Sequence, residues 1–196
     1  MRRSFMFGLV ALAVSVSTPA AEAQQAPLTF GFGYAANVPS QAVGFGAHVL
    51  FPLWGGTGLY ADMKFDPSSP DREASFEPEL THEQAAAFGD RWFQDQASWR
   101  NLNLGLIHRF TDELMVYAGA GYARRRAFSE YYDDRIPPER GDRGYYWIED
   151  PENHGDGVNF FGGAFLRVRA GLWVQFGAEA APPGVTLGLS LSFPRT

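Results

Sequence analysis

The chain has 196 residues, a formal net charge of −6 and no cysteine. This length fits a single domain, and the missing cysteines exclude a disulfide framework, a thiolate zinc site, a thiol nucleophile and a lipidated cysteine anchor. The acidic balance argues against nucleic-acid binding, and 15% aromatic residues with only 19% charged ones exclude a disordered, solvated chain.

The first residues have the pattern of an export leader. Arg2 and Arg3 precede an apolar run from Phe5 to Val16, and Ala21-Glu22-Ala23 matches an A-x-A cleavage site. The run is too short to cross the roughly 30 Å hydrocarbon layer as a helix. We therefore predict a cleaved signal peptide over residues 1–23, with an uncleaved amphipathic anchor as the alternative.

Beyond the leader, apolar residues recur at every second position. In the first such run, Thr29, Gly31 and Gly33 alternate with leucine and aromatic residues. A period of two is typical of β-strands, because their alternate side chains point to opposite faces. Eight runs fit this pattern: residues 28–34, 43–51, 59–65, 102–110, 114–122, 158–168, 172–180 and 185–193.

Each run has one apolar face and one face of small, polar or charged residues. His108 is the one polar residue on the apolar faces, and no charge lies there. The pattern fits a soluble sandwich with the apolar faces inside, or a transmembrane barrel with those faces toward lipid. Glycines such as Gly119, Gly163 and Gly177 lie on the polar faces. Glycine suits the narrow inside of a closed barrel better than a solvent face, so the barrel is favoured.

The connections predict which end of the barrel carries the large loops. Links at residues 52–58, 111–113 and 169–171 are short, whereas those at residues 66–101 and 123–157 are long. In an up-and-down barrel both long links fall at one end, as in outer-membrane barrels with long outer loops and short inner turns.

Aromatic residues are expected at both rims of the lipid-facing surface. The outer rim would carry Tyr34, Phe65, Tyr122 and Phe160, and the inner rim Phe51, Phe110 and Phe193. Two aromatic girdles are expected of a membrane barrel. His108 would lie near the inner headgroups, where a polar side chain costs little.

The leader, the eight alternating segments and the terminal run from Leu187 to Phe193 resemble the small outer-membrane β-barrels of the OmpA and OmpX kind. The resemblance covers residues 24–196. It implies an all-β, eight-stranded antiparallel up-and-down transmembrane β-barrel with two long extracellular loops, in the outer membrane of a Gram-negative-type envelope. It further implies outer-membrane lipids and the barrel-assembly machinery as partners, with no cofactor, no metal and no nucleic acid.

Charged residues on the polar faces would meet inside the barrel. They are Asp62, Lys64, Arg109, Arg167 and Glu179. An eight-stranded barrel is just wide enough for side chains to fill it, and buried charges must be paired. We interpret these residues as a structural salt-bridge network; the alternative is that they line a narrow path for ions or water.

The histidines give little support for an enzyme. His108 is followed by Arg109 and Phe110, whereas lipid A deacylases on this scaffold carry His-x-Ser. His48 is placed in the lumen with no nucleophile expected beside it, and His82 and His154 lie on loops. We therefore predict no catalytic residues.

The two long links carry most of the acidity. Residues 66–98 hold eight acidic residues against two arginines, and residues 127–157 hold nine against three, so each link has a net charge of −6. Thr81 and Gly89 are predicted to bound a short helix. The candidates for an interaction surface, on strand extensions above the membrane, are Tyr131, Tyr132, Tyr145, Tyr146 and Trp147. Divalent-cation binding is the alternative to adhesion: the segment from Asp150 to Asp156 has oxygen ligands and a glycine but does not match EF-hand spacing.

We predict a structural or surface-interaction role, similar to adhesion, carried by the acidic and aromatic loops and an unknown extracellular partner. A narrow pore for a small solute is the first alternative. A barrel enzyme and a secreted, lipocalin-like carrier with its apolar faces inside are further alternatives.

Overall fold

The computed structural model describes residues 28–51, 54–133 and 144–194. The predicted leader lies outside these residues. The strands are β1 (Thr29–Val38), β2 (Val43–Leu50), β3 (Thr57–Phe65), β4 (Arg91–Arg109), β5 (Leu114–Tyr132), β6 (Tyr145–Glu149), β7 (Gly155–Arg169), β8 (Leu172–Ala180) and β9 (Pro183–Pro194). The helices are α1 (His82–Phe88) and the short 3-10 helices η2 (Pro70–Arg72) and η4 (Pro151–Asn153). No helix in the described part of the chain is long and apolar enough to cross a membrane.

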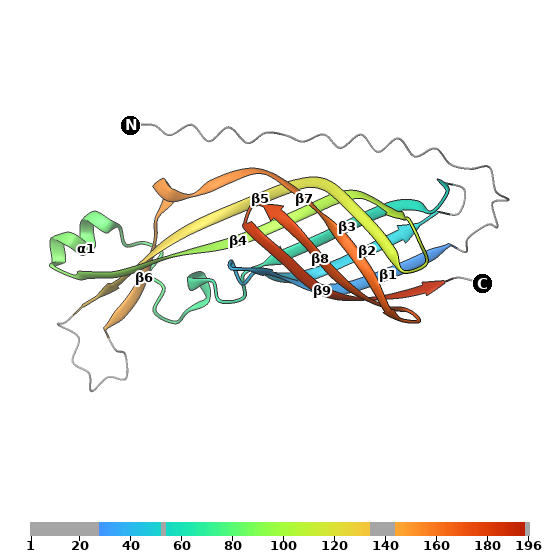
Figure 1. Cartoon of the computed structure of the whole chain (residues 1–196). Coiled ribbons are helices and arrows are strands. Elements are labelled where there is room, and N and C mark those ends of the chain that lie inside the picture. The colour runs from blue at the N-terminus through green and yellow to red at the C-terminus, as the bar shows by residue number, and fades with distance from the viewer. Residues whose placement is uncertain (1–27, 52–53, 134–143, 195–196) are drawn as a thin grey trace.

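Eight strands close into an antiparallel barrel (Figure 1). The strand order is β4-β3-β2-β1-β9-β8-β7-β5, and β5 pairs back with β4 to complete the ring. The first and last strands pair along their length, from Thr29 opposite Pro194 to Val38 opposite Val185. The predicted fold class is therefore confirmed, and closure leaves the barrel without a free sheet edge.

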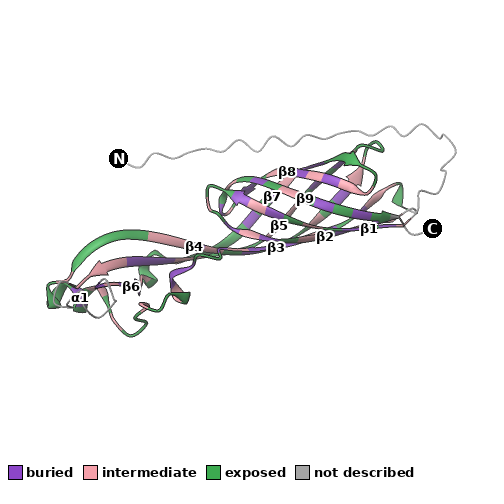
Figure 2. Ribbon diagram, turned by 90° about the horizontal axis from the view of Figure 1, so that it is seen from below, coloured by how far each residue is buried: buried purple, intermediate pink, exposed green. Residues whose placement is uncertain are grey.

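The wall of the barrel presents apolar side chains outward. Phe32, Leu104 and Phe160 are 58%, 63% and 64% exposed, whereas their strand neighbours facing inward are small or buried. Alternating bands of exposed and buried residues cross the wall of the barrel (Figure 2). An apolar surface of this extent is explained by contact with lipid, which is the arrangement expected of a transmembrane barrel.

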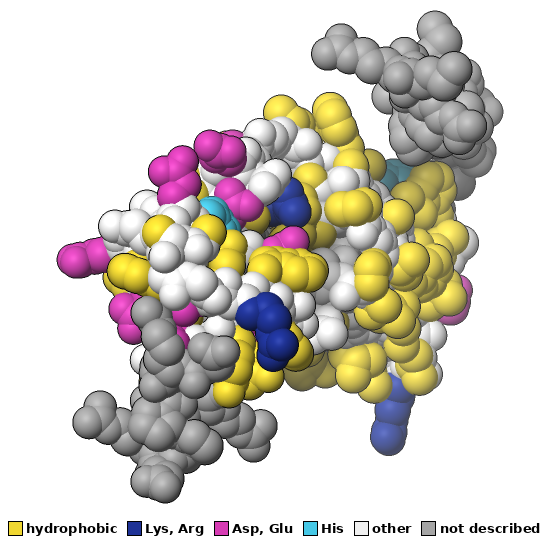
Figure 3. Space-filling model, turned by 90° about the vertical axis from the view of Figure 1, so that its left-hand side faces the viewer, with side chains coloured by type: hydrophobic (Ala, Val, Ile, Leu, Met, Phe, Trp, Pro, Cys, Tyr) yellow, Lys and Arg dark blue, Asp and Glu magenta, His cyan; other side chains and the backbone are white. Residues whose placement is uncertain are grey.

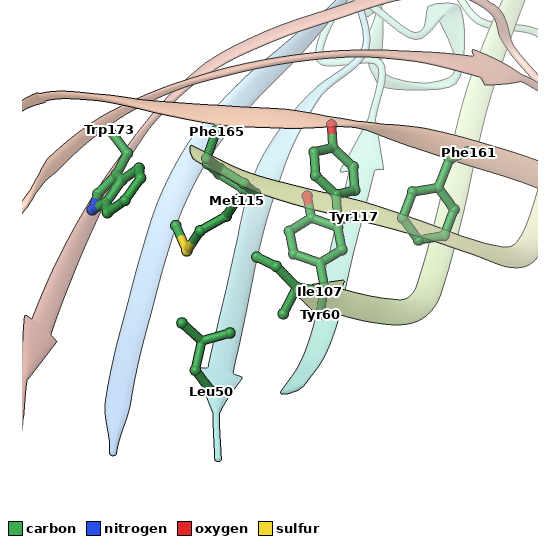
Figure 4. Close-up of a cluster of buried hydrophobic side chains, with 8 residues drawn as sticks. All are labelled: Leu50, Tyr60, Ile107, Met115, Tyr117, Phe161, Phe165 and Trp173. Carbon is green, nitrogen blue, oxygen red and sulfur yellow. The ribbon is translucent and has the colours of Figure 1, made fainter. Parts of the chain in front are cut away.

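A cluster of large side chains fills the half of the lumen nearest the short β2–β3, β4–β5 and β7–β8 connections (Figure 4). Its aromatic centre is formed by Tyr60, Tyr117, Phe161 and Phe165, with Tyr60 and Tyr117 rings 4.7 Å apart. Leu50, Ile107, Met115 and Trp173 complete it. The barrel interior is thus a packed core.

Glycines on neighbouring strands make room for this core. A Cβ on Gly177 would lie 2.4 Å from the Tyr117 hydroxyl, and one on Gly163 would lie 2.2 Å from the carbonyl oxygen of Phe176. Both glycines therefore permit a close approach that no other residue allows. This is the physical reason for glycine on the inward faces of so narrow a barrel.

The two ends of the barrel differ. The β2–β3, β4–β5 and β7–β8 connections lie at one end, which we call the inner end, where β1 begins and β9 ends. The long connections lie at the opposite end, where β4, β5 and β6 project beyond the barrel with α1 (Figure 1). The predicted asymmetry of the two ends is confirmed.

The sequence pattern predicted β4 and β5 to be shorter than they are. The structure begins β4 at Arg91, not at residue 102, and ends β5 at Tyr132, not at residue 122. Residues 91–101, predicted as loop, are therefore strand. At roughly 3.3 Å per residue, the part of β4 beyond its pairing with β3 rises about 30 Å. We call β6, α1, the two 3-10 helices and the projecting parts of β4 and β5 the extension.

The helix in the extension is bounded as the sequence predicts. Thr81 and Gln84 form a reciprocal capping box, and Gly89 ends the helix in the left-handed region at φ 83°. Ala85 is fully buried against Tyr146 and Ile148 of β6. The extension therefore has a small core of its own, separate from that of the barrel.

Candidate functional site

Three of the five predicted lumen charges meet in the barrel interior. The Lys64 ammonium lies 2.9 Å from the Asp62 carboxylate and 2.5 Å from that of Glu179, and all three side chains are at most 3% exposed. Alternation on β3 turns Asp62 and Lys64 inward from the same strand, and Glu179 reaches them from β8.

Neutral donors complete the hydrogen bonding of both carboxylates. Tyr60 and Asn103 each donate to Asp62 at 2.8 Å, and Asn101 and Thr186 each donate to Glu179 at 2.8 Å. Paired and hydrogen-bonded in this way, charges can be accommodated in an interior of low dielectric constant. We call Asp62, Lys64 and Glu179 the lumen triad.

Arg109 and Arg167 do not join the lumen triad, which corrects the predicted network. Arg109 is half-buried near the inner end and donates to the Thr29 hydroxyl at 3.3 Å. Arg167 is exposed at the same end and pairs with Glu113 at 2.7 Å. Strand alternation turns both side chains inward, but they lie next to the short turns at the inner end. They are therefore too far from Lys64 along the barrel axis to contact it.

The histidines also lie apart from one another. His48 is buried in the lumen, with its Nε2 3.2 Å from the hydroxyl of Ser192, a neighbour that the sequence did not predict. His108 contacts Thr57 on the outer wall at 2.9 Å, and His82 contacts the Tyr131 hydroxyl at 3.0 Å. The Ser192 hydroxyl is as buried as the ring beside it, and the contact is an interior hydrogen bond between β2 and β9.

The five predicted interaction residues divide between the inside and the surface of the extension. Tyr131 and Tyr146 stack at 6.1 Å beneath α1, and Tyr146 donates to Asp90 at 2.5 Å. Trp147 is buried against the segment at Phe76. Tyr132 and Tyr145 are half-buried and pack on each other. Most of this set therefore holds the extension together.

Two of the more exposed aromatic residues lie at the tip of β4, where sequence reasoning placed none; Phe88, at the end of α1, is 53% exposed. Trp92 and Phe93 are 55% and 52% exposed. A β-bulge between Trp92 and Gln94 leaves Phe93 without a partner on β5, and its ring packs edge-on against Tyr145 at 5.0 Å. The sequence does contain a signal for them, because Trp92 and Phe93 are adjacent aromatic residues just after the helix end at Gly89. It was missed because this segment was predicted as loop.

A carboxylate fixes the Trp92 ring. The indole nitrogen of Trp92 and the hydroxyl of Ser129 donate to Asp95 at 2.9 and 2.7 Å. The hydrogen bonds from Ser129 and Trp92 hold the pKa of Asp95 below its usual range. Trp92 is therefore held in one orientation by an ionised group.

The extension offers a sheet edge as well as side chains. Between Arg91 and Ser98, β4 pairs with β5, and no strand among the described residues pairs with its other edge. Gln96 bonds the carbonyl of Ser68 at 3.1 Å and covers part of that edge. Unpaired main-chain groups on an edge strand can add a strand from a partner.

Acidic side chains gather at this end, on one side of the face seen in Figure 3. The base of the extension is held by ion pairs: Arg126 contacts Asp71 and lies 2.7 Å from Glu149. The hydrogen bond from Arg126 outweighs partial burial and lowers the pKa of Glu149. Burial raises the pKa of Asp71, but the nearby Ser69 and the charges of Arg126 and Arg100 lower it overall.

The acidic segment at residues 150–156 is organised by its own amides. The backbone N–H of Asn153 donates to one oxygen of Asp150, and this hydrogen bond caps η4. The side-chain amide of Asn153 donates to the other oxygen at 2.6 Å. His154 faces Glu149 at 3.2 Å. Among the described residues, no group of three or more acidic or histidine side chains has a geometry that could hold a metal ion.

Comparisons with known proteins find likenesses to solved structures alone. No protein-family model matches the chain, and no curated protein matches its sequence. Solved structures of similar fold include the attachment invasion locus protein Ail of Yersinia pestis (9% identity, 86% of this chain and 99% of that chain, TM-score 0.48). Ail bound to the heparin analogue sucrose octasulfate (10%, 86% and 99%, 0.49) and a designed transmembrane β-barrel (12%, 87% and 98%, 0.39) are similar too. At such identities these are likenesses of fold alone.

Proposed function

We propose that this small barrel of the outer-membrane type resides in the outer membrane of a Gram-negative-type envelope and makes surface contacts through its extension. Export by the predicted leader and insertion by the barrel-assembly machinery are part of the proposal. The apolar wall would contact outer-membrane lipids, and the extension would face the outside of the cell.

The observation that carries the proposal is the pair Trp92 and Phe93 at the tip. Exposed aromatic residues on a rigid support make good binding anchors, since little conformational entropy is lost when they are buried. Asp95 and Tyr145 hold these two rings in place. The pair stands at the far end of β4, where a partner can reach it without approaching the membrane.

The surroundings of the pair define the class of partner. The acidity of both long connections favours a partner with a basic surface, because complementary charges steer encounter. The open β4 edge would supply main-chain hydrogen bonds to an extended segment. The partner we propose is therefore a basic protein that has an apolar pocket or an extended segment.

The location is tested by expressing the whole precursor in a Gram-negative host. We expect the protein in the outer-membrane fraction, with a mobility on SDS gels that changes on boiling, because a closed barrel resists SDS when unheated. Recovery in the soluble periplasm without a mobility change would refute the location.

The contact is tested by adhesion of these cells to plates coated with lysozyme, a basic protein, or serum albumin, an acidic one. We expect the Trp92→Ser/Phe93→Ser variant to adhere to lysozyme severalfold less than wild type, since aromatic anchors dominate binding energy. Trp54→Ser is the matched control: Trp54 is 56% exposed but lies at the inner end. Equal adhesion of the tip variant and the wild type, at equal amounts of folded barrel, would contradict the proposal.

A further inference from the structure

A row of arginines lies directly above the last apolar row of the barrel wall. The register sets Phe65 opposite Arg100 and Arg100 opposite Arg124. One step toward the barrel, Met63, Leu102 and Tyr122 occupy the same three strands on the same face. One such step is about 7 Å, so guanidinium groups stand where headgroups meet the hydrocarbon layer.

These residues line one pocket. Its volume is about 420 Å³, and the residues that line it include Met63, Phe65, Leu102 and Tyr122 with Arg72, Arg100 and Arg124. Arg72 reaches it from η2 and stacks over the Phe65 ring at 5.7 Å. A second pocket of about 330 Å³ shares Arg100 and Arg124 and adds Arg126 together with its acidic partner Glu149. Positive charge and apolar surface are therefore combined in one hollow.

The positive charge in the pocket is only partly compensated. Like charges directly opposite on neighbouring strands repel, as Arg100 and Arg124 do. Asp71 is 3.2 Å from Arg100 but also binds Arg126. The Arg124–Asp156 contact is 3.8 Å long between side chains that are both more than half exposed. An anion between Arg100 and Arg124 would relieve their repulsion.

We propose that this pocket binds the phosphorylated headgroup of a lipid in the surrounding outer leaflet. Arginine binds phosphate through two parallel N–H donors, and Arg100 and Arg124 together provide such donors from neighbouring strands. The acyl chains would lie against Leu102 and Tyr122. A free phosphate ion would leave this apolar wall unused, which is why the occupant is a lipid.

This site requires only that the barrel be in a membrane, and it is independent of the contact proposed for the tip. Its role would be to fix the barrel's depth and hold the base of the extension at the headgroups, because Arg100 also pairs with Asp71 of η2. Failure of the adhesion test would leave it untouched.

The test measures which lipid the barrel retains beside it. The protein is refolded in phosphatidylcholine vesicles that contain a trace of spin-labelled phosphatidic acid or spin-labelled phosphatidylcholine, and the motionally restricted fraction is recorded. We expect a preference for phosphatidic acid that falls about tenfold in Arg100→Gln/Arg124→Gln, since each basic residue near the surface contributes substantially to attraction. Arg91→Gln at the tip and Arg169→Gln at the inner end remove one equal charge each and should keep the preference.

Each outcome decides between alternatives. An unchanged preference in the double variant, or an equal loss in either control, would overturn the proposal. Displacement of labelled phosphatidic acid by inorganic phosphate at constant ionic strength would assign the pocket to the free ion instead. If the double variant lacks the heat-dependent mobility change of a folded barrel, Arg72→Gln and Arg124→Gln are measured singly, each with an expected loss of about threefold.

Discussion

At the scale of single residues, Lys64 has the most demanding position in the barrel. It is 1% exposed and lies between two carboxylates, so its loss would leave two buried negative charges facing each other. Removing one partner of a buried ion pair is far more costly than never having the pair, because the remaining charge loses both water and its counter-ion.

Lys64→Met is therefore expected to lower the free energy of unfolding by about 3–5 kcal/mol. The measurement is urea unfolding of the refolded barrel in detergent micelles, followed by the fraction that keeps its unboiled gel mobility. The control is Asp62→Asn/Lys64→Met/Glu179→Gln, which removes all three charges and leaves one amide oxygen at each carboxylate position to accept a hydrogen bond. It should recover most of the lost stability; a Lys64→Met barrel as stable as wild type would show that the ion pairs contribute nothing.

The alternation of side chains along a strand predicts which face of the barrel wall carries a charged residue. It does not predict where along the barrel axis that residue lies. All five charged residues occupy inward-facing positions. Contacts form among Asp62, Lys64 and Glu179, whereas Arg109 and Arg167 lie at the inner end of the barrel. Their nearness to the turns at residues 110–113 and 170–171 is the sequence signal that separates them. His48 shows the same limit: Ser192 becomes its neighbour only through the pairing of β1 with both β2 and β9.

At the scale of elements, the extension obeys different rules from the barrel. A strand in the wall must alternate because one face meets lipid and the other a packed lumen. Beyond the barrel wall the β4–β5 sheet meets water or a thin local core, so residues 91–101 need no strict alternation, and their pattern resembles a loop. The helix was predictable because Thr81, Gln84 and Gly89 act locally.

The base of the extension is expected to loosen in acid. Glu149 faces Arg126 and His154, and Asp71 faces Ser69, Arg100 and Arg126. Their pKa values are lowered from the ordinary 4.5 and 3.8, so they stabilise the folded extension above those values. This stabilisation is lost as pH falls through the lowered pKa values, because the unfolded extension then binds more protons.

The measurement is hydrogen exchange by mass spectrometry, comparing protection factors of β6 and β8 peptides at pH 7 and below pH 4. We expect protection of β6 to fall at least about threefold relative to β8, since one unit of pKa difference corresponds to about tenfold in an equilibrium. Glu149→Gln should begin with weaker protection and change less with pH. A parallel fall in β6 and β8 would mean that acid acts on the whole barrel.

At the scale of the whole molecule, the closed barrel was predictable because all eight segments alternate apolar residues with small or polar ones. Every apolar face expected to meet lipid is turned outward, and the glycines expected inside lie against neighbouring backbones and the Tyr117 hydroxyl. What fills the lumen was not predictable in detail. Tyr60 and Tyr117 come from strands that are adjacent to β4 on opposite sides, and only closure brings their rings to 4.7 Å.

The filled lumen argues against the narrow pore that the sequence left open. The aromatic cluster closes the inner half, and the lumen triad with its amides closes the part nearer the extension, so a solute would have to displace both. We expect no single-channel steps above the lipid background from the wild-type barrel in planar bilayers. Tyr60→Ala/Tyr117→Ala removes two rings and two hydroxyls that bond Gln175, and should give small, irregular steps. Regular steps from the wild type that change with Glu179→Gln would instead show that the triad lines a path, and the extension would then stand at the mouth of a channel.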